Sequence, residues 1–258
     1  IVRGSAQMFG VTLSENFNQP FISKTVSEFW RRWHMTLGSW FKDYVFYSVS
    51  LSKPFVKLSK KTREHMNTFF ATFVPMSIAM FIVWFGTGIW HGASWKYVMY
   101  GLYYWGIMIL GLLTEPLFKK MFAAMHVNRH GRIYRSLQVV RTFLFVNVGM
   151  LMFRADDLTV FGHMFTSMFK NFSFDPVITG SLMTVRIDMA DFIVLVAGAL
   201  ILLAVGIYRE QGHHLREELA EKNIVLRWAV YYVLIFSVII FGAYGKGYEV
   251  AGFIYAQF

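Results

Sequence analysis

Five long apolar segments constrain the fold of this chain more than any other feature. They cover residues 69–90, 95–113, 137–153, 192–208 and 228–244. A helix that crosses a bilayer needs roughly 17 to 25 such residues, because each residue rises only about 1.5 Å. The third segment is the weakest, since Arg141 and Asn147 interrupt it. The sequence therefore predicts an all-α, polytopic integral membrane protein with four or five spans.

The composition favours the same class of protein. Hydrophobic residues make up 56% of the chain and charged residues 16%, whereas soluble domains carry about 25% charged residues. The chain has no cysteine, which excludes disulfides and thiolate catalysis. No internal repeat or linker divides the sequence, so we expect residues 1–258 to form a single membrane-embedded domain.

The net charge of +10 raises the question of nucleic acid, but the placement of the charges favours a membrane. The cations gather in two blocks between apolar segments: Lys53, Lys57, Lys60, Lys61 and Arg63, then Lys119, Lys120, Arg129, Arg132, Arg135 and Arg141. Such blocks mark cytoplasmic loops and attract anionic headgroups. We expect membrane lipids and no nucleic acid as partners, with His91 toward the outer side.

A basic, aromatic-rich segment precedes the first span. Thr25 and Glu28 fit the T-x-x-E capping box, which predicts a helix over residues 26–40. We expect this helix at the cytoplasmic interface, with His34 turned inward. Arg31 or Arg32 would then reach lipid headgroups or an acidic carrier protein.

His91 is the first candidate for chemistry, because an ionisable imidazole beside an apolar span is costly to desolvate and such residues are commonly functional. Three glycines around it, Gly86, Gly88 and Gly92, favour close helix approach or backbone bends rather than a phosphate loop. A metal site is not expected. His126 and His130 are four residues apart but lack an H-E-x-x-H motif or an obvious carboxylate partner.

Several longer motifs occur in order along the chain. They are Asn16-Phe-Asn-Gln-Pro-Phe21, Glu28-Phe-Trp-Arg-Arg-Trp-His34-Met-Thr-Leu-Gly-Ser-Trp-Phe-Lys-Asp-Tyr44, Trp90-His91-Gly92, Phe153-Arg-Ala-Asp156 and Phe253-Ile-Tyr255. Together they resemble the membrane-bound O-acyltransferase superfamily, and within it the bacterial envelope branch of D-alanyl-lipoteichoic acid transferases and alginate-type O-acetylases.

The resemblance implies a helical core with a tunnel, interfacial helices and a place in the bacterial plasma membrane. It implies that His91 matches the catalytic histidine of the superfamily and His34 its second motif position. Family members are much longer than this chain, so the resemblance also implies that the chain is a C-terminal portion lacking the family's N-terminal helices.

The chemistry of acyl transfer suggests a role for each histidine and for the residues near them. A neutral imidazole is suited to accept a hydroxyl proton near pH 7, which makes His91 the candidate general base. The tetrahedral oxyanion needs a positioned donor, and His34, Trp90 and Asn16 are all candidates. Trp30 and Trp33 join Asn16 and Trp90 as candidate substrate-binding residues, although tryptophans near a membrane more often serve packing or the interface.

The resemblance implies that no cofactor is bound permanently. The acyl donor would be a phosphopantetheine thioester on an acidic carrier protein, or a coenzyme A-type donor. The acceptor would be an envelope polymer such as teichoic acid or a polysaccharide, with an extracytoplasmic partner enzyme as a further candidate. The stretch after Asp43 lacks the Pro-Leu-Gly-Gly-Asn sequence of alginate-type acetylases, which favours D-alanyl over acetyl transfer. A transporter or flippase and a noncatalytic scaffold are the alternatives.

Overall fold

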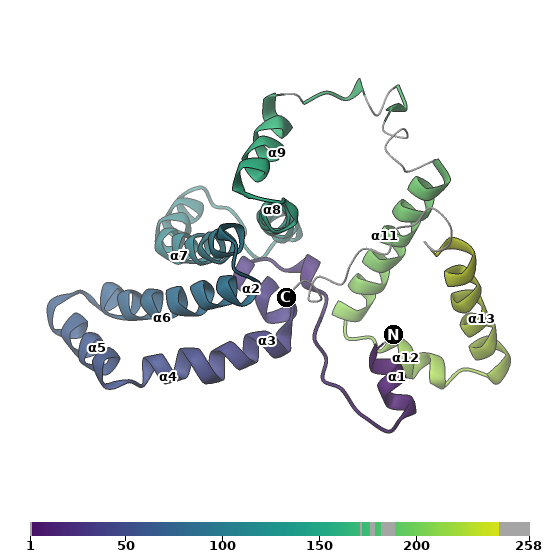
Figure 1. Cartoon of the computed structure of the whole chain (residues 1–258), viewed down its shortest axis with the longest axis horizontal. Helices are drawn as coiled ribbons and strands as arrows, with labels where there is room; N and C mark the ends of the chain where they lie inside the picture. The colour runs from purple at the N-terminus through teal and green to yellow at the C-terminus, as the bar shows by residue number, and fades with distance from the viewer. Residues whose placement is uncertain (1, 171, 176–178, 182–188, 243–258) are drawn as a thin grey trace. The chain divides into compact units, whose positions relative to one another are not determined.

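A computed structural model describes residues 2–170, 172–175, 179–181 and 189–242, and every regular element in them is a helix. The chain divides into two compact units, Ile1–Asn171 and Phe172–Phe258 (Figure 1). The first holds α1 (Val2–Met8), η1 (Pro20–Ile22), α2 (Val26–Arg32), α3 (Met35–Trp40), η2 (Phe41–Phe46), α4 (Tyr47–Ser50), α5 (Lys53–His65), α6 (Thr68–Trp90), α7 (Trp95–Ala124), α8 (Arg132–Arg154) and α9 (Leu158–Lys170). The second holds α11 (Met189–Glu210), α12 (Leu215–Ala220) and α13 (Ile224–Phe241). The single-domain organisation stays a prediction.

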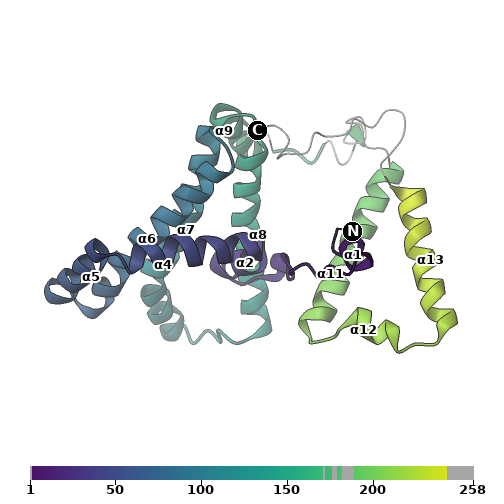
Figure 2. The same ribbon diagram turned by 60° about the horizontal axis from the view of Figure 1, so that its bottom comes forward.

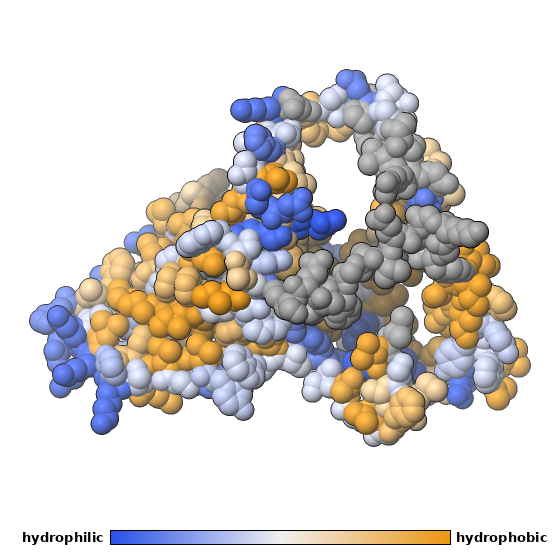
Figure 3. Space-filling model, in the orientation of Figure 1, coloured by the Kyte–Doolittle hydropathy of each residue, from blue (hydrophilic) through white to orange (hydrophobic). Residues whose placement is uncertain are grey.

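Five helices, α6, α7, α8, α11 and α13, are long and apolar enough to cross a membrane. This confirms the prediction of a polytopic all-α membrane protein. Few of their side chains are buried inside the protein, and in α13 none is. Large areas of apolar surface are visible in the space-filling view (Figure 3), as expected where lipid rather than protein covers a helix.

Helices α6, α7 and α8 follow one another along the chain, and α7 packs against both of the others. Hydroxyls on α7 bond carbonyls of α8: Tyr103 donates to Phe145 O at 2.7 Å and Tyr104 to Val146 O at 3.2 Å. On the other side of α7, Trp105 Nε1 donates to Ser77 O of α6 at 3.0 Å. Figure 2 shows α8 alongside α7 with the turn that joins them. The polar hydrogens of these α7 side chains thus bond carbonyls of neighbouring helices, so that they need no water as a partner.

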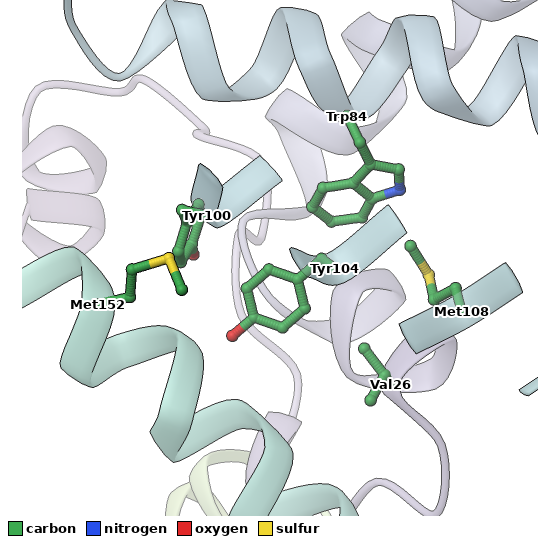
Figure 4. Close-up of a cluster of buried hydrophobic side chains, with 6 residues drawn as sticks. All are labelled: Val26, Trp84, Tyr100, Tyr104, Met108 and Met152. Atoms are coloured by element: carbon green, nitrogen blue, oxygen red, sulfur yellow. The ribbon is translucent and has the colours of Figure 1, made fainter. Parts of the chain in front are cut away.

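A small aromatic core lies where these helices meet α2. Figure 4 shows its buried members, which are Val26, Trp84, Tyr100, Tyr104, Met108 and Met152. Tyr104 is completely buried, and the Trp30 ring packs against it edge to face at 4.8 Å between centroids. Edge-to-face pairs of this kind add about 0.5–1.5 kcal/mol beyond the area they bury. The core fixes α2 against α6 and α7.

Glycines allow the backbones to come this close. A Cβ on Gly88 would lie 2.5 Å from Tyr97 O, and one on Gly101 would collide with the backbone oxygen of Trp84. Gly92 has a φ of +139°, a conformation that favours glycine. The predicted roles of Gly88 and Gly92, close helix approach and a backbone bend, are confirmed.

The predicted helix over residues 26–40 is wrong as a single element. Helix α2 ends at Arg32 and α3 begins at Met35. From there helical backbone continues through the π-helical η2 and α4, packs along α6, and ends before α5 (Figure 1). The capping box itself is present in altered form. Thr25 Oγ1 accepts from Glu28 N at 3.0 Å, but the Glu28 carboxylate accepts from Lys24 N rather than from Thr25 N.

In the second unit, a polar cluster organises the turn between α11 and α12. Glu218 accepts from the Tyr208 hydroxyl at 2.8 Å and from His214 N at 3.1 Å. The His213 ring stacks on Tyr208 with centroids 3.9 Å apart. The Tyr208 bond and a hydrogen bond to His214 N help keep the pKa of the Glu218 carboxyl below its usual range, so it is an acceptor at neutral pH.

The contact at Gly101 provides a test of the packing. Gly101→Ala should destabilise the protein by about 1–3 kcal/mol, the usual cost of overpacking, because the methyl group meets rigid backbone of α6. Gly106→Ala on the same helix has open space and should be neutral or slightly stabilising, since alanine has the higher helix propensity. Thermal unfolding in detergent of the two variants measures the difference, and equal melting temperatures would contradict the close α6–α7 contact.

Candidate active site

His91 lies at the carboxyl end of α6, directly after Trp90. Its backbone N–H donates to Gly88 O at 3.1 Å, and Gly92 then turns the chain toward α7. The side chain is half-buried. The predicted position at a helix end is confirmed, whereas a tunnel in front of the imidazole stays a prediction.

His34 occupies the break between α2 and α3 in a left-handed conformation, with φ 50° and ψ 50°. A residue with a Cβ rarely adopts this backbone conformation, which persists only where the surrounding structure enforces it. Residues 16–18 do so here. Asn18 N donates to Arg32 O at 2.8 Å and Met35 N donates to Asn16 O at 3.0 Å, one bond on each side of His34.

The Asn16 side chain strengthens this hold. Its Oδ1 accepts from Thr36 N at 3.1 Å and from Thr36 Oγ1 at 2.9 Å, within the first turn of α3. Asn16 was a candidate substrate-binding residue, and the structure places it beside the His34 turn with this amide oxygen already engaged. Its contact with substrate stays a prediction.

The indole of Trp90 contacts both histidines. Its ring centroid lies 6.1 Å from that of His34 and 4.8 Å from that of His91. The two imidazoles therefore belong to one site, and the expectation that His34 lies at the cytoplasmic interface while His91 lies toward the outer side is wrong. The break at His34 turns the following helical segment back along α6 instead of continuing α2.

Aromatic rings surround the pair. Phe153 of α8 lies 5.1 Å from His91, and Tyr97 and Tyr100 of α7 lie 6.2 and 5.9 Å from it between centroids. Phe17 lies 6.4 Å from His34. Tyr97, Tyr100 and Phe17 were not predicted as site residues, although the i, i+3 spacing of the two tyrosines after the histidine motif places them on one face of α7.

The other two predicted tryptophans lie at different depths. Trp33 is adjacent to His34, packs edge-on against Phe17 at 4.9 Å and stacks on Phe29 at 5.5 Å. Trp30 lies in the core behind the site, and its buried Nε1 has no hydrogen-bond partner among the described residues. Their roles in substrate binding stay predictions.

The environment keeps both imidazoles neutral. Burial lowers the pKa of His91 to about 4, and the nearby His34 lowers it as well. Burial also lowers the pKa of His34, whose buried Nδ1 has no hydrogen-bond partner in the described structure. Because a charged imidazole loses hydration here without gaining a counterion, the neutral form with a free lone pair prevails at pH 7.

The cationic residues next to this site are less free than the sequence suggests. Arg32 Nη2 pairs with Glu28 Oε1 at 2.8 Å, so a carboxylate already offsets its charge. Arg31 is exposed and donates weakly to Ser27 Oγ at 3.4 Å. Of the two arginines predicted to reach headgroups or an acidic carrier, Arg31 is the better placed.

The arrangement combines a neutral proton acceptor, a second imidazole and an aromatic enclosure. A neutral imidazole offers an unprotonated ring nitrogen to a reacting hydroxyl group, and apolar walls strengthen any hydrogen bond to a developing negative charge. The site is thus suited to proton abstraction from a hydroxyl group in a poorly hydrated setting. It lies within an all-helical, multi-pass membrane protein, which defines the class to which the chain belongs.

Comparison with known proteins narrows that class. The chain is 33% identical over 167 residues to the probable alginate O-acetylase AlgI of Pseudomonas aeruginosa, which is 65% of this chain and 27% of that protein. It is 36% identical over 150 residues to the teichoic acid D-alanyltransferase of Bacillus subtilis, covering 58% and 34%. It is 28% identical over 157 residues to the peptidoglycan O-acetyltransferase of Helicobacter pylori, covering 60% and 25%. No family model matches the chain.

The chain is therefore related to the bacterial envelope branch of the membrane-bound O-acyltransferase family, as its motifs predict. The region that it shares with these relatives is about a quarter to a third of their length, 25% to 34%. The motifs of residues 16–44, 90–92 and 153–156, which carried the resemblance, come together around the two histidines. The closing Phe253-Ile-Tyr255 motif lies outside the described residues.

The His91 environment predicts a pH dependence. An unfolded histidine protonates near 6.5 and folded His91 near 4, so the stability from this group is present above pH 6.5 and is lost as the pH falls toward 4. The melting temperature should therefore drop more steeply over this range in the wild type than in His91→Gln. Histidine NMR should show the pKa of His91 rising in His34→Gln, because the neighbouring imidazole is removed. A His91 titration at 6.5 in both proteins would contradict this electrostatic account.

The hold on His34 predicts a graded effect at Asn16. Asn16→Ala removes the Oδ1 acceptor and should loosen the left-handed turn, whereas Asn16→Asp keeps an acceptor oxygen and should preserve it. Hydrogen exchange of the Thr36 amide, read by mass spectrometry of the peptide that contains it, should rise about tenfold in the alanine variant, the equivalent of one lost hydrogen bond of about 1.4 kcal/mol. Equal protection in both variants would rule out this hold.

Proposed function

We propose that this chain forms the catalytic part of a membrane-bound O-acyltransferase. It would move an acyl group, D-alanyl or acetyl, from a thioester donor to a hydroxyl of a cell-envelope polymer such as teichoic acid or a polysaccharide. The observation that carries the proposal is the shared contact of His34 and His91 with Trp90, in a chain related to three kinds of envelope acyltransferase.

In this proposal His91 is the general base. The acceptor hydroxyl gives its proton to the neutral imidazole as its oxygen attacks the thioester carbonyl, which forms a C–O bond and a tetrahedral oxyanion. Collapse of the oxyanion breaks the C–S bond, and the proton on His91 passes to the departing thiolate. The low pKa of His91 ensures that the base is unprotonated before the reaction and returns the proton readily afterwards.

His34 has the second role. A ring N–H from His34 is one donor for the oxyanion, and the Trp90 indole N–H and the Asn16 amide N–H₂ are others. His34 also has a left-handed backbone, a strained conformation of the kind that clusters at active sites. The rings of Phe153, Tyr97 and Tyr100 would exclude water, which would otherwise hydrolyse the thioester.

The donor and acceptor follow from the relatives. A phosphopantetheine thioester on an acidic carrier protein suits a D-alanyltransferase of teichoic acid, and a coenzyme A-type or other thioester would suit acetyl transfer. The missing Pro-Leu-Gly-Gly-Asn stretch favours D-alanyl, while the similarity to alginate O-acetylases and a peptidoglycan O-acetyltransferase favours acetyl. Mass analysis of envelope polymers from cells with and without the gene distinguishes the two.

Substitution of the histidines tests the mechanism. His91→Ala and His91→Gln should both reduce acyl transfer by about 10² to 10⁴-fold, the usual contribution of a general base, with donor binding nearly unchanged because the proton moves only in the chemical step. Glutamine mimics one hydrogen bond but cannot accept the proton. His34→Ala should also lower transfer, through weaker oxyanion binding or acceptor orientation.

The measurement is product formation by the reconstituted full-length protein with an acylated donor. His163→Ala, at an exposed position of α9, is the matched control and should transfer normally. Normal turnover in a folded His91 variant would remove His91 from the mechanism and favour a scaffold. Polymer precursor crossing the membrane at an unchanged rate without any acylation would favour a transporter or flippase.

A further inference from the structure

Helix α5 is the most cationic helix in the described structure. Its thirteen residues carry five exposed cations, Lys53, Lys57, Lys60, Lys61 and Arg63, and one acid, Glu64. Within the described residues none of the five has an ion-pair partner. Lys60 and Glu64 are four residues apart, a spacing at which lysine and glutamate often pair, yet no such pair is formed in the described structure. All five cations are therefore available for an external partner.

The inner face of α5 is fixed to the protein. Thr62 is buried, and its hydroxyl donates to Ala71 O at 3.1 Å and to Ser59 O at 3.0 Å. Phe55 and Leu58 are half-buried on the same face. At 100° per residue, Lys53, Lys57 and Lys60 lie on the opposite face, and Lys61 lies on the flank between the two faces. The cations therefore point outward from a helix whose position is set by its contact with α6.

The residues next to this outward face are apolar and exposed. The short connection from α5 to α6 and the first turn of α6 expose apolar side chains, with Met66, Phe69 and Phe70 each 41% to 45% exposed. These side chains require hydrocarbon, whereas lysines one or two turns away require water or anions. In Figure 3 the hydrophilic surface at the position of α5 borders directly on the apolar surface of its neighbours.

We infer that α5 is a docking helix for anionic phospholipid headgroups. A helix with a cationic face and adjoining apolar side chains lies in the interfacial layer and recruits anionic lipid. An acidic protein would also be attracted by the charge, but a cationic face that continues into apolar side chains matches the layered chemistry of a lipid, phosphate outside and acyl chain inside. The inference does not depend on acyl transfer.

The absence of cysteine in the chain allows a direct measurement. Val56→Cys, at a 54% exposed position between the lysines, provides the one cysteine of residues 1–258 for a fluorophore, with any cysteine elsewhere in the full-length protein replaced by serine. The labelled full-length protein is reconstituted in phosphatidylcholine vesicles that contain a small fraction of quencher-labelled phosphatidylglycerol or quencher-labelled phosphatidylcholine. At low salt, the phosphatidylglycerol probe should quench several-fold more strongly at equal mole fraction, and high salt should abolish the difference because exposed charges are screened.

Charge removal on α5 supplies the decisive comparison. Lys57→Gln, Lys60→Gln and Lys61→Gln together should remove most of the several-fold preference for phosphatidylglycerol, since each cation near a membrane surface contributes roughly fivefold to the attraction. The matched control removes three exposed cations elsewhere, Lys119→Gln, Lys120→Gln and Arg135→Gln, and should leave the preference intact. Circular dichroism and melting temperature establish that both triple variants fold.

Three outcomes would overturn the inference. The first is equal quenching by the two lipids in the wild type. The second is a preference that persists in the α5 triple variant or is lost equally in the control. The third is that an acidic carrier protein changes the fluorescence at position 56 only when the lysines are present, while the lipid preference is the same with or without them, which would assign α5 to a protein partner.

Discussion

The left-handed turn at His34 is the constraint on which the site depends. In a continuous helix over residues 26–40, residues 35–40 would follow the axis of α2 instead of turning back along α6, and the backbone of His34 would lose the orientation in which its ring meets Trp90. The turn costs on the order of 1–3 kcal/mol. Four hydrogen bonds offset this cost. Two are backbone bonds, one on each side of the turn, and two more are accepted by the Asn16 amide oxygen. Residues 16–18, a short segment before α2, thereby determine the orientation of the His34 imidazole.

The second requirement is the close approach of α6 and α7. Gly88 and Gly101 leave no room for side chains between the two backbones, and the result is that His91, at the end of one helix, faces Tyr97 and Tyr100 at the start of the next. Phe153 completes this surround from α8 because Tyr103 and Tyr104 bond the carbonyls of Phe145 and Val146. The packing that stabilises the helices and the packing that lowers the pKa of His91 are the same contacts.

Much of the fold was predictable because apolar length is a local property. The five spans, the cap at Thr25 and the glycine contact at Gly88 follow from residues near each other in sequence. The break at His34 was not, since nothing in residues 26–40 forbids a helix; it is imposed by residues 16–18 through bonds that only the folded chain contains. The expectation that His34 and His91 lie on different sides of the membrane rested on the cationic blocks, which carry no information about the contacts between the segment around His34 and the end of α6. The sequence motifs identified both histidines, but not that both contact the indole of Trp90.

Helix α6 separates two kinds of chemistry. Thr62 of the cationic α5 is bonded at Ala71, near its start, and His91 follows its last residue; twenty residues of helix between them span about 30 Å, close to the thickness of a hydrocarbon core. Charges that position the protein against headgroups are therefore remote from the imidazoles, where a cation would compete with the neutral base. Electrostatic attraction to the membrane and proton abstraction in a dry site require opposite environments. Helix α6 allows both environments in one protein, because its apolar length separates the cationic α5 from the imidazoles.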